Sequence, residues 1–515
     1  MPDGGPGTSA PTASFFEVTG IPGYDTRLTQ GGEEVDRPRR LRDRRQVVGA
    51  ADNTVAALRR PVAHRHGSRR PVAHGAQAVT ASPRRLRVAL TATPLYGHVA
   101  PLVAVGEALV QRGHEVTLLT GARFADLAAR HGLGFTPLPI EADVAAGPTG
   151  PSSRPRVLEG RDAILRTFVR PIPAQHAALV ELLSDGHWDA VLSDAAYLGA
   201  IPLLLSGPPD GRLPVLGVST TPLSLVSVDC APFGSALQPG VTGWSRMRNR
   251  HIDCLLRHGP LRPVYDELDA VLAGYGVPPG TVDYFDHARY FDLTFHLAPP
   301  EIEYRRRELP SSVRFVGPMK PGAIAAPRPP WWGDLDGRCV VLVTQGTLDV
   351  DPRKLIAPTV RALADEPVMT VVTTGGASEG TLTDALGGWL PANVRVAPFL
   401  PYDDLLPRVR AVVSNGGFGG VQQALRHGVP LVVAGDTEDK PEVAARVRRV
   451  GAGIDLRTRT PSARQVRRAV RAVLADPGYL ARAALVSRSI DRLGDPSTTI
   501  ADAVEAAARE PVVST

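Results

Sequence analysis

The sequence contains few cysteines and no long apolar run. Only Cys230, Cys254 and Cys339 occur in 515 residues, far apart and without CxxC spacing. Neither a disulfide framework nor a cysteine zinc site is indicated, and a reducing, cytoplasmic location is expected. The longest apolar runs, at 201–205 and 430–434, have the length of a buried strand, not the roughly 20 residues of a membrane helix. We therefore expect no integral membrane segment.

Excess positive charge is absent from most of the chain. Residues 1–85 hold 14 Arg, no Lys and 8 acidic residues, so the whole net charge of +6 lies there. Nucleic acid is therefore not expected as a partner. This stretch lacks apolar periodicity and repeats RRPVAH at 59–64 and 69–74. It is expected to be a disordered basic extension, or upstream sequence translated from a misplaced start codon; a basic interaction arm is the alternative.

The rest of the chain alternates short apolar strands with helices, which predicts an α/β fold with parallel sheets. A first series begins with a strand at 87–91, a loop holding Gly97 and His98, and a helix from 101. A second series begins at 339–347, after a proline-rich stretch. The expected organisation is a Rossmann-like domain at 86–300, a linker at 301–335, a second such domain at 336–475, and helices at 476–510 that pack back toward the first domain.

A glycine-rich turn connects a strand to a helix in the second series. Four glycines, Gly416, Gly417, Gly419 and Gly420, lie within five positions. Glycine lets a ligand approach the backbone N–H groups at a helix N-terminus, where anions bind. The turn is therefore either a cradle for a diphosphate or a tight strand-to-helix connection, and the glycines alone do not decide between the two.

Two polar residues follow strands of the first series. His98 comes after the strand at 87–91, and Asp194 after a strand at 190–192. Carboxyl ends of parallel strands share one edge of a sheet, where α/β proteins place reactive groups. The pair could be a base and the acid that orients it; equally, His98 could be a solvated loop residue and Asp194 a helix cap.

The pattern NGGFGGVQQALRHGVPLVVAGDTEDKPEVAARV resembles the nucleotide-sugar signature of the macrolide-type and UDP-glucuronosyl/UDP-glucosyl glycosyltransferases. GHVAP near the start, VGP before the linker and QGT after it lie where that family has them. The resemblance covers roughly residues 86–509. It implies the GT-B fold, in which two Rossmann-like doubly wound domains face each other across a cleft, and an inverting, metal-independent transfer of a hexosyl-type sugar. It also implies that the domain at 86–300 binds the acceptor and that the domain at 336–475 binds the nucleotide sugar.

Carried over by residue, the resemblance makes His98 the general base that deprotonates the acceptor and Asp194 the acid that holds it. The donor is a TDP- or UDP-sugar, and no other cofactor is implied. The acceptor is a small hydrophobic molecule, such as a polyketide or aromatic product of antibiotic biosynthesis or other secondary metabolism. A homodimer is left open. The residues implied in donor binding are Thr347, Phe399, Leu400, Asn415, Gly416, Gly417, Phe418, Gly419, Gly420, Gln423, Asp439 and Lys440.

Four positions depart from the family pattern. Asn415 replaces the histidine before the glycines, Gly420 a Thr or Ser, Gln423 a ribose-binding Glu, and Lys440 a sugar-contacting Gln. These changes support the alternative of a catalytically silent homologue that binds a nucleotide sugar or partners an active transferase. A sugar-nucleotide epimerase of the same fold is a further alternative, but it needs extra carboxylates in the cleft that the sequence does not place.

Overall fold

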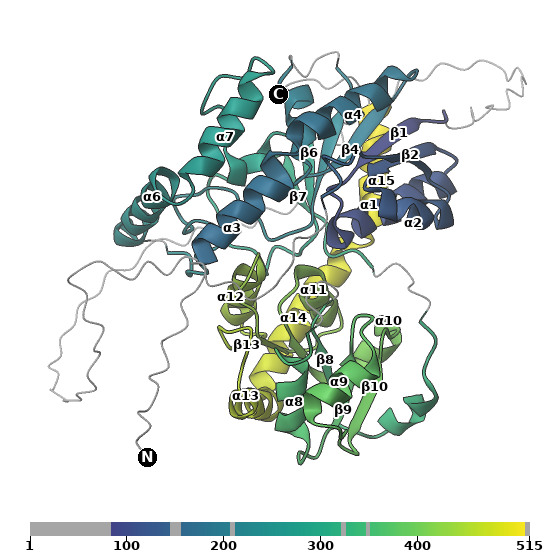
Figure 1. Cartoon of the computed structure of the whole chain (residues 1–515), viewed down its shortest axis with the longest axis vertical. Coiled ribbons are helices and arrows are strands. Elements are labelled where there is room, and N and C mark those ends of the chain that lie inside the picture. The colour runs from purple at the N-terminus through teal and green to yellow at the C-terminus, as the bar shows by residue number, and fades with distance from the viewer. Residues whose placement is uncertain are drawn as a thin grey trace, which may run out of the picture. The chain divides into compact units, whose positions relative to one another are not determined.

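The computed structural model describes residues 84–144, 156–206, 212–240, 242–320, 326–346 and 351–509. From Arg85 onward these residues belong to one compact unit. The extension predicted for residues 1–85 lies outside the described residues, apart from its last two. Two parallel sheets organise the unit (Figure 1).

The first sheet has the strand order β3-β2-β1-β4-β5-β6-β7. Its central strands β1, β4 and β5 are almost completely buried, as expected for parallel strands covered by helices on both faces. The chain order reverses between β1 and β4, which makes their carboxyl ends a topological switch point. The strands are β1 (Arg87–Thr91), β2 (Glu115–Thr120), β3 (Gly134–Pro137), β4 (Ala190–Asp194), β5 (Val215–Ser219), β6 (Leu293–His296) and β7 (Val313–Phe315).

Helices cover both faces of this sheet. One face packs against α1 (Tyr96–Gln111), α2 (Ala125–Arg130) and the C-terminal α15 (Pro496–Arg509). The other packs against a larger helical layer. That layer contains α3 (Arg156–Ile164), the π-helical turn η2 (Leu165–Val169), α4 (Ile172–Ser184), α5 (Ile201–Leu205), α6 (Gly243–His258) and α7 (Arg262–Ala273). This half also has the 3-10 turns η1 (Ala122–Phe124), η3 (Leu198–Ala200) and η4 (Tyr284–Arg289).

The second sheet has the order β10-β9-β8-β11-β12-β13, again parallel, with its switch point between β8 and β11. Helices α11, α12 and α14 cover one face, and α8, α9 and α13 the other. The elements are β8 (Val340–Thr344), α8 (Ile356–Leu363), β9 (Met369–Thr373), α9 (Glu379–Leu386), β10 (Val394–Ala397), α10 (Tyr402–Leu405), β11 (Val409–Ser414), α11 (Phe418–Arg426), β12 (Leu431–Val433), α12 (Lys440–Val450), β13 (Gly453–Asp455), α13 (Ala463–Ala475) and α14 (Pro477–Leu493), with 3-10 turns η5 (Pro330–Leu335) and η6 (Leu406–Arg408).

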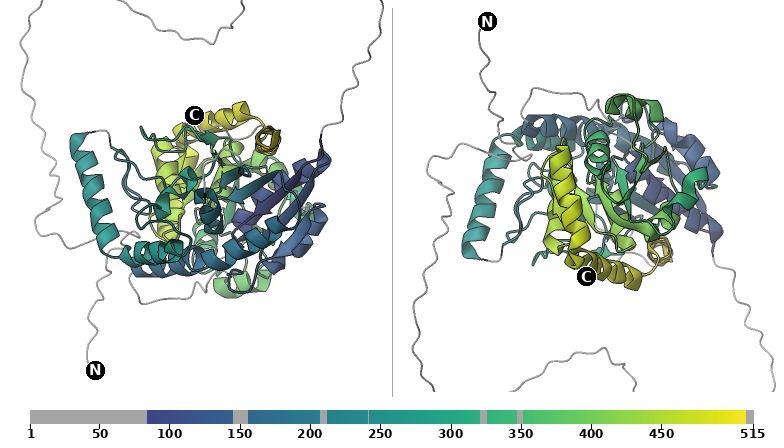
Figure 2. Two further views of the ribbon diagram at one scale, coloured as in Figure 1. Left: turned by 90° about the horizontal axis from the view of Figure 1, so that it is seen from above. Right: turned by 90° about the horizontal axis from the view of Figure 1, so that it is seen from below.

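The last two helices connect the halves of the unit. Helix α14 packs on α11 of the second half, and α15 packs on α1 of the first. Glu505 on α15 accepts hydrogen bonds from Arg112 and His114 at 3.0 and 3.1 Å. The yellow helices in Figure 1, and in the two further views of Figure 2, show this C-terminal segment.

The structure contradicts two of the expectations about local structure. Helix α1 begins at Tyr96, not at Pro101, so His98 lies in a helical turn and not in a loop. The N–H groups of His98 and Val99 bond to the Leu95 carbonyl at 2.9 and 3.0 Å, which starts the helix before the proline. The segment at 301–335, expected as a linker, contains β7, which pairs with β6 and extends the first sheet.

Candidate active site

The switch point of the first sheet brings a histidine and an aspartate together. His98 Nδ1 and a carboxylate oxygen of Asp194 lie 2.9 Å apart, and both side chains are buried. Asp194 also accepts hydrogen bonds from the backbone N–H groups of Thr93 and Ala196, at 3.3 and 3.2 Å. The carboxylate therefore caps the following turn and orients the imidazole at once. Among the residues that the structure describes, Nε2 of His98 has no hydrogen-bond partner.

The environment of the pair favours a histidine that can take up a proton. Burial lowers the pKa of His98, but the charge and hydrogen bond of Asp194 outweigh burial, so the pKa lies above its ordinary value. Burial acts to raise the pKa of Asp194. The charge and hydrogen bond of His98, with the hydrogen bonds from Thr93 and Ala196, have the larger effect, and the pKa of Asp194 therefore lies below its ordinary value. Asp194 is therefore ionised and stabilises an imidazolium. Thr220 Oγ1 lies 3.1 Å from the same Nδ1.

A carboxyl group of the second half of the unit also acts on His98. Asp439 is the N-cap of α12, and its charge contributes to the raised pKa of His98. Burial raises the pKa of Asp439 itself to about 6, and Lys440 is the strongest influence in the opposite direction. The start of α12 therefore lies close to the histidine.

The glycine-rich turn follows β11 at the switch point of the second sheet. Gly416 has a φ of 88°, and a Cβ there would lie 2.8 Å from the side chain of Val433. A Cβ on Gly419 or Gly420 would meet nothing within 4 Å, and both residues are exposed. Gly416 is thus required by the turn, whereas Gly419 and Gly420 leave the N-terminus of α11 open to a ligand. The tight-turn interpretation is confirmed at Gly416, and the diphosphate cradle at Gly419 and Gly420 stays a prediction.

Asn415 connects this turn to the neighbouring strand. Its Nδ2 donates to the backbone carbonyl of Gln345, which directly follows β8, and its Oδ1 accepts from the N–H of Gly417 at 3.3 Å. The amide therefore holds the turn against the end of β8. Thr347, the other donor-binding residue predicted here, lies outside the described residues.

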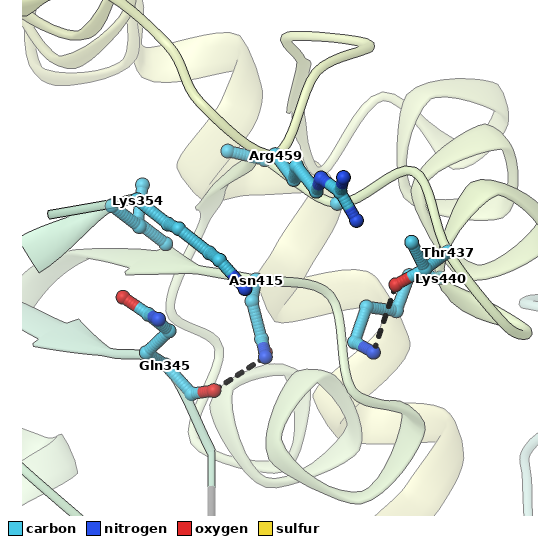
Figure 3. Close-up of a pocket in the computed structure, with 9 residues that line it drawn as sticks. Gln345, Lys354, Asn415, Thr437, Lys440 and Arg459 are labelled. Atoms are coloured by element: carbon cyan, nitrogen blue, oxygen red, sulfur yellow. Dashed lines mark hydrogen bonds between the residues drawn. The ribbon is translucent and has the colours of Figure 1, made fainter. Parts of the chain in front are cut away.

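A small hollow, partly open to solvent, lies beside the turn. Figure 3 shows that Lys354, Lys440 and Arg459 line it from three segments. Lys440 pairs with the Glu438 carboxylate, and Arg459 lies 3.9 Å from that of Asp436. This concentration of cations favours an anionic group. The lining residues are Gln345, Lys354, Leu355, Asn415, Ala434, Gly435, Thr437, Lys440 and Arg459.

Comparison with known proteins identifies the chain. Residues 90–182 match the glycosyltransferase family 28 N-terminal domain, and residues 371–506 match the erythromycin biosynthesis protein CIII-like C-terminal domain. The 4'-demethylrebeccamycin synthase of Lentzea aerocolonigenes is 40% identical over 408 residues, which cover 77% of this chain and 94% of that protein. The chain belongs to the macrolide-type and UDP-glycosyltransferase-like family. The predicted resemblance is confirmed.

Other relatives of this glycosyltransferase agree. UDP-glycosyltransferase 2 of Phaeomoniella chlamydospora is 35% identical over 459 residues, which cover 82% of this chain and 96% of that protein. Among solved structures, the calicheamicin glycosyltransferase CalG4 matches with a TM-score of 0.63 at 24% identity, over 82% of this chain and 98% of that chain. This likeness shows the GT-B fold, as the sequence predicted.

The other residues predicted to bind the donor differ in how far they are exposed and in what they contact. Phe399 is 43% exposed, whereas Leu400 is buried in the core. The ring of Phe418 is buried and stacks on His296 with centroids 6.0 Å apart, so only its backbone is left for a ligand. Gln423 Nε2 donates to the Met319 carbonyl at 2.7 Å, and its buried Oε1 has no partner in the described part of the chain.

Sequence reasoning missed several residues of the site. Lys354, Arg459 and Thr220 belong to no recognised motif, and each is one among many charged or hydroxyl residues of its kind. Only the order of the strands brings them beside the predicted residues. Among the helices that the structure describes, none is both long and apolar enough to cross a bilayer.

Proposed function

We propose that this glycosyltransferase moves a hexosyl-type sugar from a TDP- or UDP-sugar to a hydroxyl of a small hydrophobic natural product, with inversion and without a metal. The observation that carries the proposal is the His98–Asp194 pair, at 2.9 Å, at the switch point of the first sheet. Because Asp194 occupies Nδ1, the base is Nε2. Names of relatives and fold neighbours, 4'-demethylrebeccamycin synthase and calicheamicin glycosyltransferase, support such an acceptor.

In this reaction, Nε2 of His98 takes the proton of the acceptor hydroxyl as its oxygen bonds to the anomeric carbon. The bond from that carbon to the diphosphate oxygen breaks, and its electron pair leaves with the nucleoside diphosphate. The ionised Asp194 stabilises the imidazolium that forms. A positioned general base of this kind contributes about 10²–10⁴-fold to the rate.

The leaving diphosphate gains negative charge, which the second half is suited to meet. The open N-terminus of α11 offers backbone N–H groups at Gly419 and Gly420. Lys440 and Arg459 supply positive charge in the adjoining hollow, which supports transfer without a metal. Asp439 and Lys440, close to His98, would contact the hydroxyls of the donor sugar.

The test combines calorimetric binding of TDP and UDP, with EDTA and then with magnesium, and a transfer assay. His98→Ala should lower transfer by about 10²–10⁴-fold and leave diphosphate affinity unchanged. His176→Ala, which changes a half-buried histidine elsewhere in the first half, should alter neither. Unchanged transfer in His98→Ala would remove His98 from the mechanism, and binding only with magnesium would refute metal independence.

One observation favours the silent homologue as a second candidate. One N–H of Asn415 Nδ2, at the position of the family histidine, donates to the Gln345 carbonyl, which leaves at most one donor for a phosphate. If the wild-type protein binds neither TDP nor UDP under any condition, this candidate takes precedence.

A further inference from the structure

A row of aromatic side chains leads away from His98. The imidazole and the Phe168 ring have centroids 6.4 Å apart, and Phe168 lies 6.3 Å from Tyr284. Tyr284 meets Phe285 edge-on at 5.0 Å, and Phe285 lies 6.0 Å from Phe233. These distances are those of interacting aromatic pairs. A continuous aromatic wall, defined here as Phe168, Tyr284, Phe285 and Phe233, thus begins at the base.

The wall is partly accessible at both ends, and the backbone holds its first ring in place. Phe168 and Phe233 are half-buried, so each keeps an open ring surface. Phe168 lies on the π-helical turn η2, closed by a bond from Arg170 N–H to the Leu165 carbonyl at 2.9 Å. Single π-helical turns are rare and are frequent at functional sites. This turn places the Phe168 ring against the imidazole.

The far end of the wall is fixed to the donor half. Gly234, next to Phe233, and Ala236 donate their backbone N–H groups to the carboxylate of Glu442 on α12, at 2.9 and 2.8 Å. The same helix begins with Lys440, beside Asp439. The aromatic wall therefore runs from the base to the helix that carries the predicted sugar contacts.

A second histidine lies on this wall. His287 is half-buried, its ring lies 6.3 Å from that of Tyr284, and its Nδ1 donates to the Tyr284 carbonyl at 2.8 Å. Burial lowers the pKa of His287, and the charges of both Asp194 and His98 act on it, which places it near the base. With the proton on Nδ1, the neutral ring presents Nε2 as an acceptor. In the part of the chain that the structure describes, this Nε2 has no partner.

The hydroxyl of Tyr284 is similarly available. It has no hydrogen-bond partner among the described residues, and burial raises the pKa of Tyr284, so the group stays protonated. A phenol donor and an imidazole acceptor thus accompany aromatic surface at the base.

We propose that the aromatic wall binds a planar aromatic acceptor by stacking, and that His287 Nε2 accepts a hydrogen bond from a second hydroxyl or N–H of that acceptor. The proposal rests on the proposed function and specifies its acceptor. Successive rings of the wall are tilted by 37–80° to one another, so an aromatic acceptor stacks on the half-buried ring of Phe168 or Phe233 and not along the whole row. A second donor group satisfies a nitrogen that otherwise has no partner among the described residues. His287 is thereby a specificity-determining residue and takes no proton in the reaction.

The test uses a dihydroxynaphthalene, its monomethyl ether and the saturated decalin diol as acceptors. Calorimetry without a nucleotide sugar should show that the wild type binds the dihydroxynaphthalene about tenfold more tightly than the ether. It should bind the decalin diol most weakly. His287→Asn keeps a donor near Nδ1 but lacks the Nε2 acceptor, so the preference over the ether should fall to about onefold. His287→Gln, whose amide reaches the Nε2 position, should retain most of the preference for the dihydroxynaphthalene over its ether.

His176 provides a matched control. Its Nδ1 also donates to a backbone carbonyl, that of Gly199 at 3.0 Å, and its ring meets Tyr275 edge-on at 4.8 Å. His176→Asn should leave the preference unchanged. The proposal is overturned if the decalin diol binds as well as the aromatic diol, if no aromatic diol binds, or if His287→Asn keeps the preference.

The two proposals fail in distinguishable ways. Binding of the aromatic diol that depends on His287, without sugar transfer from any TDP- or UDP-sugar, would refute the proposed function and support the acceptor site. Transfer to acceptors without regard to aromaticity or to His287 would refute the acceptor site and support the proposed function.

Discussion

At the scale of single residues, the protein uses burial and charge in opposite ways on its histidines. Asp194 overcomes the effect of burial on His98, which gains a raised pKa. In the described part of the chain, His287 has no such hydrogen-bonded carboxylate, and burial lowers its pKa. One imidazole is therefore suited to take up a proton, and the other to accept a hydrogen bond while neutral.

The raised pKa of His98 makes transfer sensitive to acid. Only the neutral imidazole is a base, so kcat/KM should fall as the pH decreases through this raised pKa. In Asp194→Asn the raising charge is gone and burial still lowers the pKa, so the fall should move to lower pH. The high-pH plateau should also drop by about 10²–10⁴-fold, because the imidazole is no longer oriented or stabilised. The pH profile of both proteins measures this.

Asp229→Asn is the control, because Asp229 pairs with Arg246 and Arg307 in another part of the first half. Its profile should coincide with that of the wild type. If the fall of kcat/KM at low pH occurs at the same pH in Asp194→Asn as in the wild type, a group other than His98 causes it.

At the scale of elements, the connection from β11 to α11 separates two roles that glycine performs. Gly416 has a backbone conformation and a close contact that exclude a side chain, whereas Gly420 has space around it. The sequence shows four equivalent glycines, and the structure divides them into those that build the turn and those that open it. The same reasoning explains why Gly420 can replace a Thr or Ser without loss of the turn.

Gly416→Ala and Gly420→Ala should therefore differ. In Gly416→Ala the left-handed φ costs about 1–2 kcal/mol, and the contact with Val433 adds to this loss of stability. In Gly420→Ala the free energy of unfolding should not fall, and affinity for TDP or UDP should be retained, because a Cβ there meets nothing within 4 Å and the family pattern has the larger Thr or Ser at this position. Urea unfolding and calorimetry give the two quantities. Equal destabilisation by both substitutions would contradict this division of roles.

At the scale of the whole unit, a buried ion network joins the two halves. Arg446 on α12 is 1% exposed and pairs with Glu442 at 2.7 Å and with Glu303 of the first half at 3.0 Å. Glu303 also bonds to His296 at 3.2 Å and to the N–H of Leu223 at 2.9 Å. Glu442 in turn holds the loop of Phe233. The donor helix and the acceptor wall are thus positioned by one network.

Arg446→Met should leave Glu442 buried without its cation, and Glu303 with His296, the Leu223 N–H and the more distant Arg306, at 3.5 Å. A loss of about 3–5 kcal/mol in the free energy of unfolding is expected. The network holds the pKa of Glu303 well below its ordinary value despite burial. Its ionised form therefore stabilises the fold above the pKa of the unfolded chain, and this stability is lost as the pH falls through the folded-state pKa. Urea unfolding at neutral and acidic pH measures both effects.

Arg307→Met is the control, because Arg307 is exposed and its partner Asp229, at 3.0 Å, keeps Arg246 as a second partner at 2.9 Å. Its stability should match that of the wild type. If Arg446→Met were equally stable, the network would not hold the halves together.

The sequence by itself determined the elements and the family. Apolar strands, glycine turns and helix ends are local, so the parallel strands, the glycine-rich turn and the order of motifs could be predicted from it. It also predicted that His98 and Asp194 would share one edge, because carboxyl ends of parallel strands do.

Tertiary structure decided what depends on contacts between distant segments. One local feature was also not predicted: α1 starts at Tyr96, through bonds to Leu95, although Pro101 indicated a later start. Lys354 and Arg459 reach one hollow, and Phe168, Tyr284 and Phe233 one wall, only because the chain order reverses at two switch points. The protonation preferences of His98 and His287 follow from burial and neighbouring charge, which no local pattern encodes.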